Sequence, residues 1–415
     1  MAGKAERVNV ASTCVPHRSV DMNRHWQTTL TVVLSLVLAA GCTNDSSTIL
    51  ISPTAARHDV APSVTADQGE LVLGDLANPR ALTFGPEGAL YVAEAGRGGA
   101  PQNSGPCFVL LSQTMCYGPT GAITRLWKGQ RARVATGLPS YAQINSGRAE
   151  GPNGVSINGL GNAWVTVGLE GNPELRDAAP ELAGFAQLVH LSPSALSPGN
   201  GAGNGRRTWE FVADLGQYER DANPDCGDLD SNPFGVLAEG NDVIIADAGA
   251  NTFVRRDANG TLSNFAVFSN NTTVPGPGCP SASTRDFVPT SVIRGPDGAY
   301  YMGHLNGLPI AMGSSSVWRM ERGGVPQPHL TGFTWILALA FDGNGNLYVL
   351  QHSDGAMTAA PGSLVRIAPD GTRNLVVTGI PRPGGLAVDR DGAVYISMIP
   401  GANYKAAGEV RRYTP

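Results

Sequence analysis

Charged side chains are scarce in this sequence. Asp, Glu, Lys and Arg together make up 15% of the 415 residues, against about 25% in a typical soluble domain. The formal net charge is −5, and the chain contains no block of basic residues. A protein that binds nucleic acid needs clustered Lys and Arg to neutralise phosphates. We therefore expect no nucleic-acid partner.

Several catalytic motifs are also missing. The chain has no GxSxG nucleophile elbow, no HExxH zinc motif, no P-loop and no CxxC pair, so it lacks the local signatures of α/β-hydrolases, zincins, P-loop NTPases and CxxC zinc or redox sites. GNGAGNG at 199–205 contains G-x-G, but it lies among Pro, Ser and Gly rather than between a strand and a helix. This pattern is typical of a flexible insertion.

Long apolar runs are absent beyond the N-terminus. TLTVVLSLVLAAG at 29–41 is too short to span a bilayer comfortably but has the length of a signal-peptide core. Arg24 and His25 precede it, so we interpret Met22 as the start and residues 1–21 as an upstream extension. No other apolar run is long enough to cross a membrane. The segment 1–41 is therefore predicted to direct export.

The apolar run ends in LAAGC, which resembles a bacterial lipobox with Ala39 in place of the usual Leu. The pattern predicts a lipid on Cys42, with plain secretion as the alternative. Acyl chains on one Cys would hold an exported domain at a membrane surface without a spanning segment. Residues 42–68 are rich in Ser, Thr, Asp and Ala and are expected to form a flexible tether.

Cysteine is sparse, and its number fits export. Of six Cys, Cys14 precedes the predicted mature protein and Cys42 is the anchor candidate. Four remain, and an even number in an oxidising compartment indicates two disulfides. Three pairings are possible. We favour Cys107–Cys116 with Cys226–Cys279, because each bond then closes one loop region.

What the chain has in abundance is Gly (53) and Pro (30), about a fifth of all residues. Many turns favour an all-β protein. One pattern occurs six times: a turn, a short apolar strand, a Gly-containing turn, a second strand centred on Tyr, Trp or Ile, and a polar residue. It describes a β-hairpin with a tight turn. The copies begin at positions 79, 152, 233, 289, 335 and 383.

The spacing of the copies predicts the fold. The last two steps, 46 and 48 residues, match a four-stranded propeller blade. The longer steps contain insertions, and most copies are followed by a second hairpin, which completes four strands. The sixth copy has only GEVRRYT (408–414) after it, and GELVLGDL (69–76) can supply the missing strand. The sequence thus predicts an all-β, six-bladed β-propeller over 69–415, closed by its N-terminal strand in the last blade.

Particular stretches also resemble known families. PGGLAVDRDGAVYIS and ADAGAN resemble NHL-type six-bladed propellers and, more distantly, gluconolactonase-like calcium lactonases. NPRALTFGPEGALYVAEAGRGG, GPTGAITRLW, AEGPNGVSI, NPFGVLA and VPTSVIRGPDGAYYMGHLNGLPI are similar to the ScyD/ScyE family of secreted propellers, which is associated with scytonemin biosynthesis. The similarity covers nearly all of 69–415. It implies the fold and an exported location, and little about chemistry.

Polar residues at strand ends mark a candidate site. In such propellers the end of the second strand and the turn before the first lie on one face of the ring. The residues expected around the central opening on that face are Glu94, Glu150, Asn153, Glu170, Asn232, Asp247, Asn251, His304 and His352. Such a ring could hold Ca²⁺ or Mg²⁺, and His would favour a transition metal. Glu94 and Asp247 are the leading ligand candidates.

The alternative interpretation is structural. Asp and Asn at strand ends commonly cap turns through their side-chain oxygens, and Asp247 and Asn251 in ADAGAN could do only that. His304 and His352 are two of seven His in the chain, and we place them at equivalent repeat positions. This coincidence favours a role at the opening, although a His-lined channel can simply bind water.

A second cation candidate is DANPDCGDLDSN at 221–232. Asp221, Asn223 and Asp225 have the D-x-N-x-D spacing of a calcium loop, but the sixth position is not Gly and the twelfth is not Glu. A solvated acidic loop is the alternative. Asp342-Gly-Asn-Gly-Asn346 is similar in letters, but it is predicted to be a hairpin turn.

Two classes of function remain. One is a binding or assembly module for a small molecule or protein partner, which would use the opening and the insertions at 97–121, 169–207 and 269–286. The other is a metal-dependent hydrolase or lactonase, in which a divalent cation polarises a carbonyl and activates water. Glu94, Asp247 and a His within ligand distance would favour the enzyme. An exposed aromatic patch on the insertions would favour the binding module, our preferred hypothesis, acting as a monomer.

Overall fold

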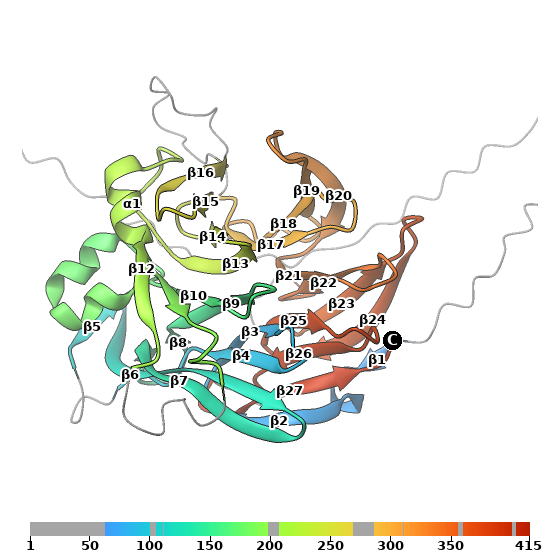
Figure 1. The fold of residues 1–415 in the computed structure, drawn as a ribbon, viewed down its shortest axis with the longest axis horizontal. Helices are drawn as coiled ribbons and strands as arrows, with labels where there is room; N and C mark the ends of the chain where they lie inside the picture. Colours follow the sequence, from blue (N-terminus) through green and yellow to red (C-terminus); the bar gives the residue numbers. More distant parts are fainter. Residues whose placement is uncertain are drawn as a thin grey trace, which may run out of the picture. The chain divides into compact units, whose positions relative to one another are not determined.

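The computed structural model describes residues 63–99, 105–110, 112–197, 207–268, 286–309, 311–355, 360–400 and 404–415. It confirms the predicted six-bladed β-propeller (Figure 1). Each blade is an antiparallel sheet of at least four strands. The first strand of every blade contacts the first strands of the two neighbouring blades, so six inner strands surround the axis.

The blades follow the order of the chain. Blade 1 is β3 (Pro79–Phe84), β4 (Leu90–Glu94), β6 (Gln113–Trp127) and β7 (Gln130–Gln143); blade 2 is β9 (Pro152–Ile157), β10 (Ala163–Val167), β11 (Gln187–Leu191) and β12 (Glu210–Asp214). Blade 3 is β13 (Pro233–Glu239), β14 (Asp242–Asp247), β15 (Thr252–Arg256) and β16 (Leu262–Val267); blade 4 is β17 (Pro289–Arg294), β18 (Tyr300–His304), β19 (Ser315–Met320) and β20 (Gln327–Phe333). Blade 5 is β21 (Ile336–Phe341), β22 (Leu347–Gln351), β23 (Gly362–Ile367) and β24 (Arg373–Ile380); blade 6 is β25 (Pro383–Val388), β26 (Val394–Met398), β27 (Gly408–Tyr413) and β2 (Glu70–Leu76).

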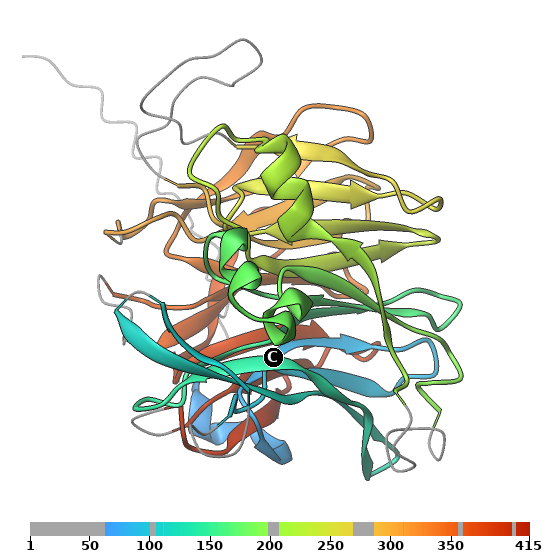
Figure 2. The same ribbon diagram turned by 90° about the vertical axis from the view of Figure 1, so that its left-hand side faces the viewer.

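The insertions add short elements at the rim of the ring. These are β5 (Cys107–Leu110) and β8 (Ala149–Glu150) on blade 1, the 3₁₀ helices η2 (Pro173–Ala178) and η3 (Pro180–Gly184), and α1 (Leu215–Ala222). Figure 2 faces the side on which α1 and the two 3₁₀ helices lie against the blades. No helix among the described residues is long and apolar enough to cross a membrane.

The ring closes as the sequence predicts. β2 pairs antiparallel with β27 and forms the outer strand of blade 6. A second contact was not predicted: β1 (Val64–Thr65) pairs parallel with β24 of blade 5, and η1 (Ala66–Gln68) joins it to β2. Residues 64–68, which the sequence analysis places in the tether, are therefore part of the folded domain. Closure leaves fewer strand edges open to foreign pairing.

Tight turns set the register of the inner hairpins. In the 342–346 turn, Asp342 Oδ1 accepts the N–H groups of Asn344 and Asn346 at 2.9 and 2.8 Å. Gly345 has φ +81°, a conformation in which a side chain would be strained. The predicted hairpin turn is confirmed. It is closed by two backbone hydrogen bonds, from the Asp342 N–H to the Asn346 carbonyl and from the Gly345 N–H to the Asp342 carbonyl, and the equivalent pair recurs at 85–89, 158–162, 295–299 and 389–393.

The hydrophobic core lies between the blades. Apolar side chains form a separate cluster at each of the six junctions between consecutive blades, such as Leu350, Leu364 and Ile396 between blades 5 and 6. Trp164 packs between blades 2 and 3, and Tyr348 packs between blades 5 and 6. Burial of apolar surface is the main source of stability, so each blade depends on both neighbours.

The axis of the ring is narrow. The central cavity is about 100 Å³, and its lining residues come from all six inner strands. Glycines allow the strands to approach: a Cβ at Gly154 would lie 2.4 Å from the carbonyl O of Phe234. Hydroxyls connect neighbouring blades, with Thr166 Oγ1 donating to the same carbonyl at 2.7 Å and Ser397 Oγ donating to the Arg80 carbonyl at 2.6 Å. The axis itself therefore has little room for a ligand.

The predicted Cys107–Cys116 disulfide is confirmed and joins β5 to β6. Cys42 and Cys279 lie outside the described residues, as does the segment 1–62. Lipidation, export and the Cys226–Cys279 bond therefore stay predictions.

Candidate binding site at the channel mouth

One backbone hydrogen bond recurs in all six blades and defines the mouth. The residue after each second strand donates its N–H to the carbonyl of the residue before the inner strand. The pairs are Ala95 to Asn78, Gly168 to Gly151, Ala248 to Asn232, Leu305 to Val288, His352 to Trp335 and Ile399 to Arg382. The ends of the second strands and the starts of the inner strands therefore lie on one face, as the repeat pattern predicts.

Glu94 is a structural residue of this face. Its side chain is 0% exposed. Its Oε2 accepts the Ala77 N–H at 2.7 Å and Arg133 Nη2 at 2.9 Å. Its Oε1 accepts Thr124 Oγ1 at 2.5 Å and Arg133 Nε at 3.2 Å. Both oxygens are occupied by a two-pronged Arg pair and two further donors, so the side chain has little capacity left for a cation.

Asp247 and Asn251 also make local contacts. Asp247 Oδ2 accepts Ser231 Oγ at 2.7 Å, and its Oδ1 accepts the Asn232 N–H at 2.6 Å. Burial raises the pKa of Asp247 to about 6, although these hydrogen bonds act in the opposite direction. Asn251 donates to Asp225 Oδ2 at 3.0 Å and accepts the Val288 N–H at 3.0 Å. Asp247 Oδ1 also accepts the Ala250 N–H at 3.3 Å, so Asp247 caps a turn as in the structural alternative, whereas Asn251 bridges segments that are distant in the sequence.

The two histidines are not equivalent, contrary to our expectation. His304 pairs with Pro289, whereas Gln351 holds the corresponding position opposite Ile336, and His352 is one residue further on. The fifth inner strand begins with Ile336 rather than with the proline that marks the other five. Our alignment of the fifth repeat copy, which begins at position 335, was therefore displaced by one residue. Gln351 Oε1 accepts the Thr334 N–H at 2.6 Å, in the same way that Glu94 caps Ala77.

His304 is buried within blade 4. Its Nδ1 contacts the Phe287 carbonyl at 3.2 Å, and its Nε2 accepts the Ser316 N–H at 3.0 Å. These contacts require a neutral ring with the proton on Nδ1. Burial lowers the pKa of His304 to about 4. Both ring nitrogens are used, so no lone pair of His304 faces the mouth.

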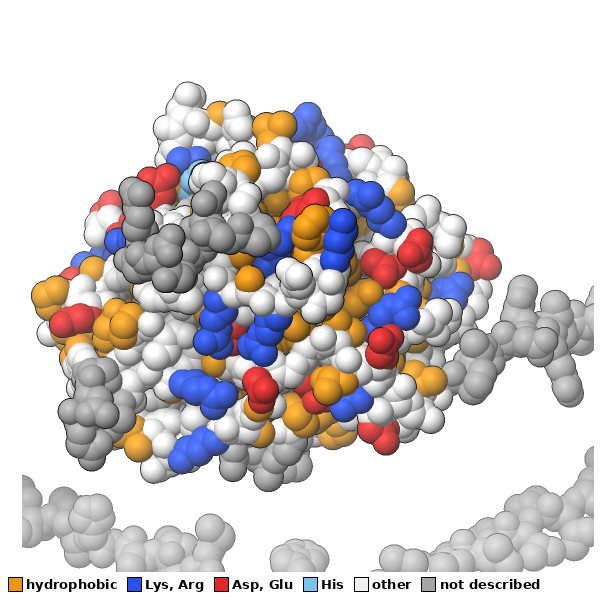
Figure 3. Space-filling view, turned by 60° about the horizontal axis from the view of Figure 1, so that its bottom comes forward, with side chains coloured by type: hydrophobic (Ala, Val, Ile, Leu, Met, Phe, Trp, Pro, Cys, Tyr) orange, Lys and Arg blue, Asp and Glu red, His pale blue; other side chains and the backbone are white. Residues whose placement is uncertain are grey.

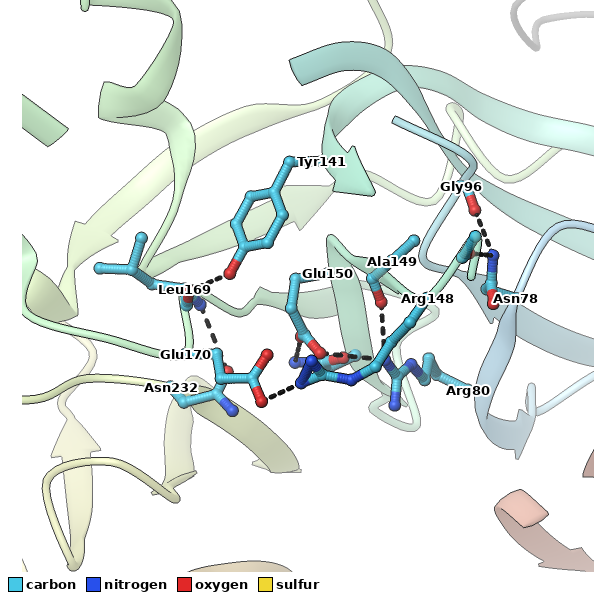
Figure 4. A network of polar contacts seen from close by, with 12 residues as sticks. Asn78, Arg80, Gly96, Tyr141, Arg148, Ala149, Glu150, Leu169, Glu170 and Asn232 are labelled. Atoms are coloured by element: carbon cyan, nitrogen blue, oxygen red, sulfur yellow. Dashed lines mark hydrogen bonds and ion pairs between the residues drawn. The ribbon is translucent and has the colours of Figure 1, made fainter. Parts of the chain in front are cut away.

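A polar network from blades 1, 2 and 3 does reach the mouth (Figure 4). Arg80, near the start of β3, donates through Nη2 to Glu150 Oε1 at 3.0 Å and to the Ala149 carbonyl at 2.7 Å. Glu150, on β8, also accepts Asn153 Nδ2 through its Oε2 at 3.3 Å. Asn153, at the start of β9, donates further to the Pro233 carbonyl at 3.4 Å. Three predicted residues, Glu150, Asn153 and Asn232, thus lie in one network.

Glu170 joins this network from the segment that follows β10, the second strand of blade 2. It has φ +58° and forms an ion pair with Arg148. Burial raises the pKa of Glu170, the charge of Glu150 adds to this rise, and Arg148 opposes it. The preceding residue, Leu169, donates its N–H to Asn232 Oδ1 at 3.2 Å and accepts a hydrogen bond from Tyr141.

Gly168 makes this convergence possible. A Cβ at this position would lie 2.3 Å from Asn153 Nδ2, 2.5 Å from Asn232 Oδ1 and 2.9 Å from Glu150 Oε2. No side chain larger than hydrogen fits among these three polar groups. The sequence pattern predicted Glu150, Asn153 and Asn232 at the opening but gave no prediction for Arg80 and Arg148. The only sequence feature that could have indicated these two residues is that each is an arginine next to a predicted site segment, in a chain with few charged residues.

Several polar atoms around the mouth are buried and have no hydrogen-bond partner among the described residues. They include Asn78 Oδ1, Asn153 Oδ1, Glu170 Oε2, Trp335 Nε1 and His352 Nδ1. Burial lowers the pKa of His352 to about 4, and the charge of Arg80 contributes to this shift. The Arg80 charge also acts on Glu170, so it affects the pKa of both titratable groups. Buried polar atoms are nearly always paired, so a cluster of unpaired ones indicates a place for water or a ligand.

The three residues of the candidate calcium loop do not converge on a common point, and each makes its own local contact. Asp221 accepts Gln217 Nε2 at 2.9 Å, Asn223 ends α1 with φ +34°, and Asp225 accepts the Gly227 N–H at 2.8 Å. Within the described part of the chain, no group of three or more His, Cys, Asp or Glu is arranged to hold a metal ion. Bound calcium or another divalent cation therefore stays a hypothesis.

Comparisons with known proteins agree with the fold only. No protein-family model matches the chain, and no curated protein matches its sequence. Among solved structures, it is similar to a protein provisionally assigned as a gluconolactonase (12% identity, TM-score 0.45, 84% of this chain and 94% of that one). It is also similar to an inactive variant of virginiamycin B lyase from Staphylococcus aureus (12%, 0.42, 83% and 98%). A third is the calcium-binding protein regucalcin from Agrobacterium tumefaciens (15%, 0.36, 60% and 67%). These values do not transfer an activity to this chain.

Proposed function

We propose that the protein is a binding propeller that holds a small, uncharged polar molecule at the channel mouth. The observation that supports this most directly is the set of unpaired buried atoms at Asn153, Glu170 and His352. A ligand that donates to Asn153 Oδ1 and Glu170 Oε2 and contacts His352 Nδ1 would satisfy all three. Leaving such groups unpaired costs about 1–3 kcal/mol each, so a matching ligand gains affinity by pairing them.

The charge at the mouth favours a neutral ligand. Arg80 pairs with Glu150 and Arg148 pairs with Glu170, so the positive and negative charges balance. His352 is neutral at pH 7 because its pKa is about 4. The wider surface is also mixed in sign: on the side of β2 and β7, Lys and Arg side chains lie among Asp and Glu side chains (Figure 3). This surface therefore has no strong electrostatic field of one sign that would select an ionic ligand.

The metal-dependent hydrolase is less well supported than the binding module. Its leading ligand candidates, Glu94 and Asp247, have their oxygens occupied by local donors. A divalent cation would instead have to sit at Glu150, Asn153 and Asn232 and displace the Arg80 contact. Ca²⁺ is the cation that such oxygen donors prefer, so the binding experiment must distinguish this alternative.

The location and family of the protein are proposed on sequence features. The run at 29–41 and Cys42 support an exported protein anchored by lipid. The ScyD/ScyE resemblance supports the same location and a role in handling a small molecule or a protein partner. The protein would act as a monomer, because one closed ring already pairs its edge strand β2 with β27.

The test is calorimetric titration of the purified protein with a panel of neutral polyols, sugar lactones and cyclic amides, with either EDTA or CaCl₂. The variants are Glu170→Gln and His352→Phe, and the control is Glu321→Gln, which changes an exposed carboxylate. We expect at least one compound to bind in EDTA and both mouth variants to weaken it at least tenfold. Lack of binding by the whole panel would overturn the proposal. Binding that requires Ca²⁺ would replace it with the metal-dependent alternative.

A further inference from the structure

A second cavity lies on the flank of the ring, between the outer strands of blades 1 and 2. Its volume is about 590 Å³, which is within the 300–1,000 Å³ range of small-molecule sites. Its walls come from β6, β7, η3 and the start of β12. They include Tyr117, Pro139, Glu181, Arg207, Trp209 and Phe211. None of its lining residues belongs to the polar network at the mouth. We call this cavity the flank groove.

The flank groove is built where two insertions meet. The insertion 97–121 supplies Tyr117, and the insertion 169–207 supplies η3 and Arg207. Its floor is fixed: Trp209 Nε1 donates to the Thr136 carbonyl at 2.9 Å, and Thr208 Oγ1 donates to the Val134 carbonyl at 3.0 Å. These bonds attach the approach to β12 onto β7, so the groove is formed before a ligand arrives.

Close packing also shapes the groove. A Cβ at Gly184 would lie 2.6 Å from Pro139 Cγ and 3.1 Å from Phe211 Cζ. The backbone of η3 is thus seated directly against blade 1 and the Phe211 ring. Phe211 is 39% exposed, a large apolar ring facing water at a surface hollow. Tyr117 is half-buried beside it in the lining.

The polar groups of the groove carry opposite charges. The Arg207 guanidinium carbon lies 3.7 Å from the Trp209 ring centre and 5.1 Å from that of Phe211. Arg207 uses Nε to bond the Trp209 carbonyl at 3.0 Å, which holds the flat guanidinium against the rings with its terminal N–H groups toward solvent. Glu181 is exposed on the other wall. Burial and the charge of Glu181 raise the pKa of Tyr117, so its hydroxyl stays protonated.

We propose that the flank groove binds an oligosaccharide. The exposed Phe211 ring offers a flat apolar face to the C–H side of a sugar ring, whereas Trp209 is 9% exposed and lies beneath the Arg207 guanidinium. A planar guanidinium and a carboxylate beside them can donate to and accept from adjacent hydroxyls. One positive and one negative group leave no net charge, which favours a neutral sugar. A proline-rich peptide fits less well, because Trp209 Nε1, the donor such a peptide would need, is already bonded to Thr136.

The groove provides variants that separate filling from folding. Ala183 lines the groove and is exposed, so Ala183→Trp would occupy the space with little change to the core. Phe211→Ala removes the exposed ring, and Arg207→Gln removes the planar donor. The control is Leu375→Ala, an exposed apolar residue on the outer strand of blade 5. Melting curves of every variant show whether a loss of binding reflects unfolding.

The experiment is a glycan array probed with the full-length protein, followed by calorimetry with the soluble oligosaccharide that gives the strongest signal. We expect a neutral oligosaccharide to be retained, Ala183→Trp and Phe211→Ala to weaken it at least tenfold, and Leu375→Ala to bind as the wild type does. Glu170→Gln should also leave this binding unchanged, so the site stands or falls independently of the channel mouth. Retention of no glycan, or Ala183→Trp binding as tightly as wild type, would overturn the proposal. Preference for a proline-rich peptide over every glycan would overturn it too.

Discussion

Substitution of Gly168 by Ala is the sharpest test of the mouth. The added methyl would lie 2.3 Å from Asn153 Nδ2 and 2.5 Å from Asn232 Oδ1. Contacts below 3.0 Å do not occur at real Cβ atoms, so both amides must move. The Asn232–Leu169 and Asn153–Glu150 hydrogen bonds, at 3.2 and 3.3 Å, would then be weakened or lost.

The expected cost can be worked out from these contacts. Overpacking by one methyl typically destabilises a protein by about 1–3 kcal/mol, and each lost hydrogen bond adds about 1 kcal/mol. We therefore expect Gly168→Ala to lower the free energy of unfolding by about 3–5 kcal/mol if both hydrogen bonds are lost. Because the moved amides carry the unpaired Asn153 Oδ1, binding of the mouth ligand should fall by more than tenfold.

The assay combines urea unfolding with calorimetric titration of the mouth ligand. The matched control is Gly343→Ala, because a Cβ at Gly343 meets nothing within 4 Å. It makes the same chemical change in open space and should alter neither stability nor binding by a measurable amount. If Gly168→Ala unfolds and binds as Gly343→Ala does, the convergence of Asn153, Asn232 and Glu150 around Gly168 is refuted.

Three further predictions concern the fold. Glu94→Ala leaves the buried Ala77 N–H and Thr124 hydroxyl without their acceptor, whereas Arg133 is 45% exposed and can turn to water, so urea unfolding should show a loss of about 1–3 kcal/mol for each of the two buried donors; a loss below about 1 kcal/mol in total would contradict this role of Glu94. Asp247 keeps its proton up to a pKa of about 6 in the folded state, against 3.8 ordinarily, so its contribution to stability is present below pH 3.8 and declines as the pH rises to about 6, by about 3 kcal/mol. Asp247→Asn should lack this decline, so the stability difference between wild type and variant should fall as the pH rises from 3.8 to about 6, and an identical pH profile for the two proteins would count against the raised pKa. Of the described elements, a chain that begins at residue 69 lacks only β1 and η1, and it should fold with a lower melting temperature. A chain that begins at residue 78 also lacks β2, the partner of β27, and should show no cooperative melting by circular dichroism. Cooperative melting of the shorter chain would show that closure of the ring by β2 is dispensable.

The fold could be predicted because its signals are local. Each hairpin is recognised within a short segment, from its Gly-containing turn and its period-two apolar pattern. Six such hairpins imply a ring, because the last blade lacks one strand and the segment 69–76 can supply it. The register of the fifth copy was misjudged because Ile336 stands where the other copies have Pro. The β1–β24 pair was missed because two residues, Val64 and Thr65, carry no pattern of their own.

The sequence by itself determined which polar residues come to one face, because the end of every second strand is fixed by the hairpin repeat. Only the tertiary structure decided what each of them does there. Glu94 is occupied by Thr124 and Arg133 from the third and fourth strands of its own blade, whereas Glu150 meets Arg80 from 70 positions earlier. The physical reason is that a repeat fixes the position of a side chain, but the donors that fill its lone pairs come from segments brought together only by folding. Asn153, Glu170 and His352 differ from Glu94 and Asp247 in that packing left one atom of each unpaired.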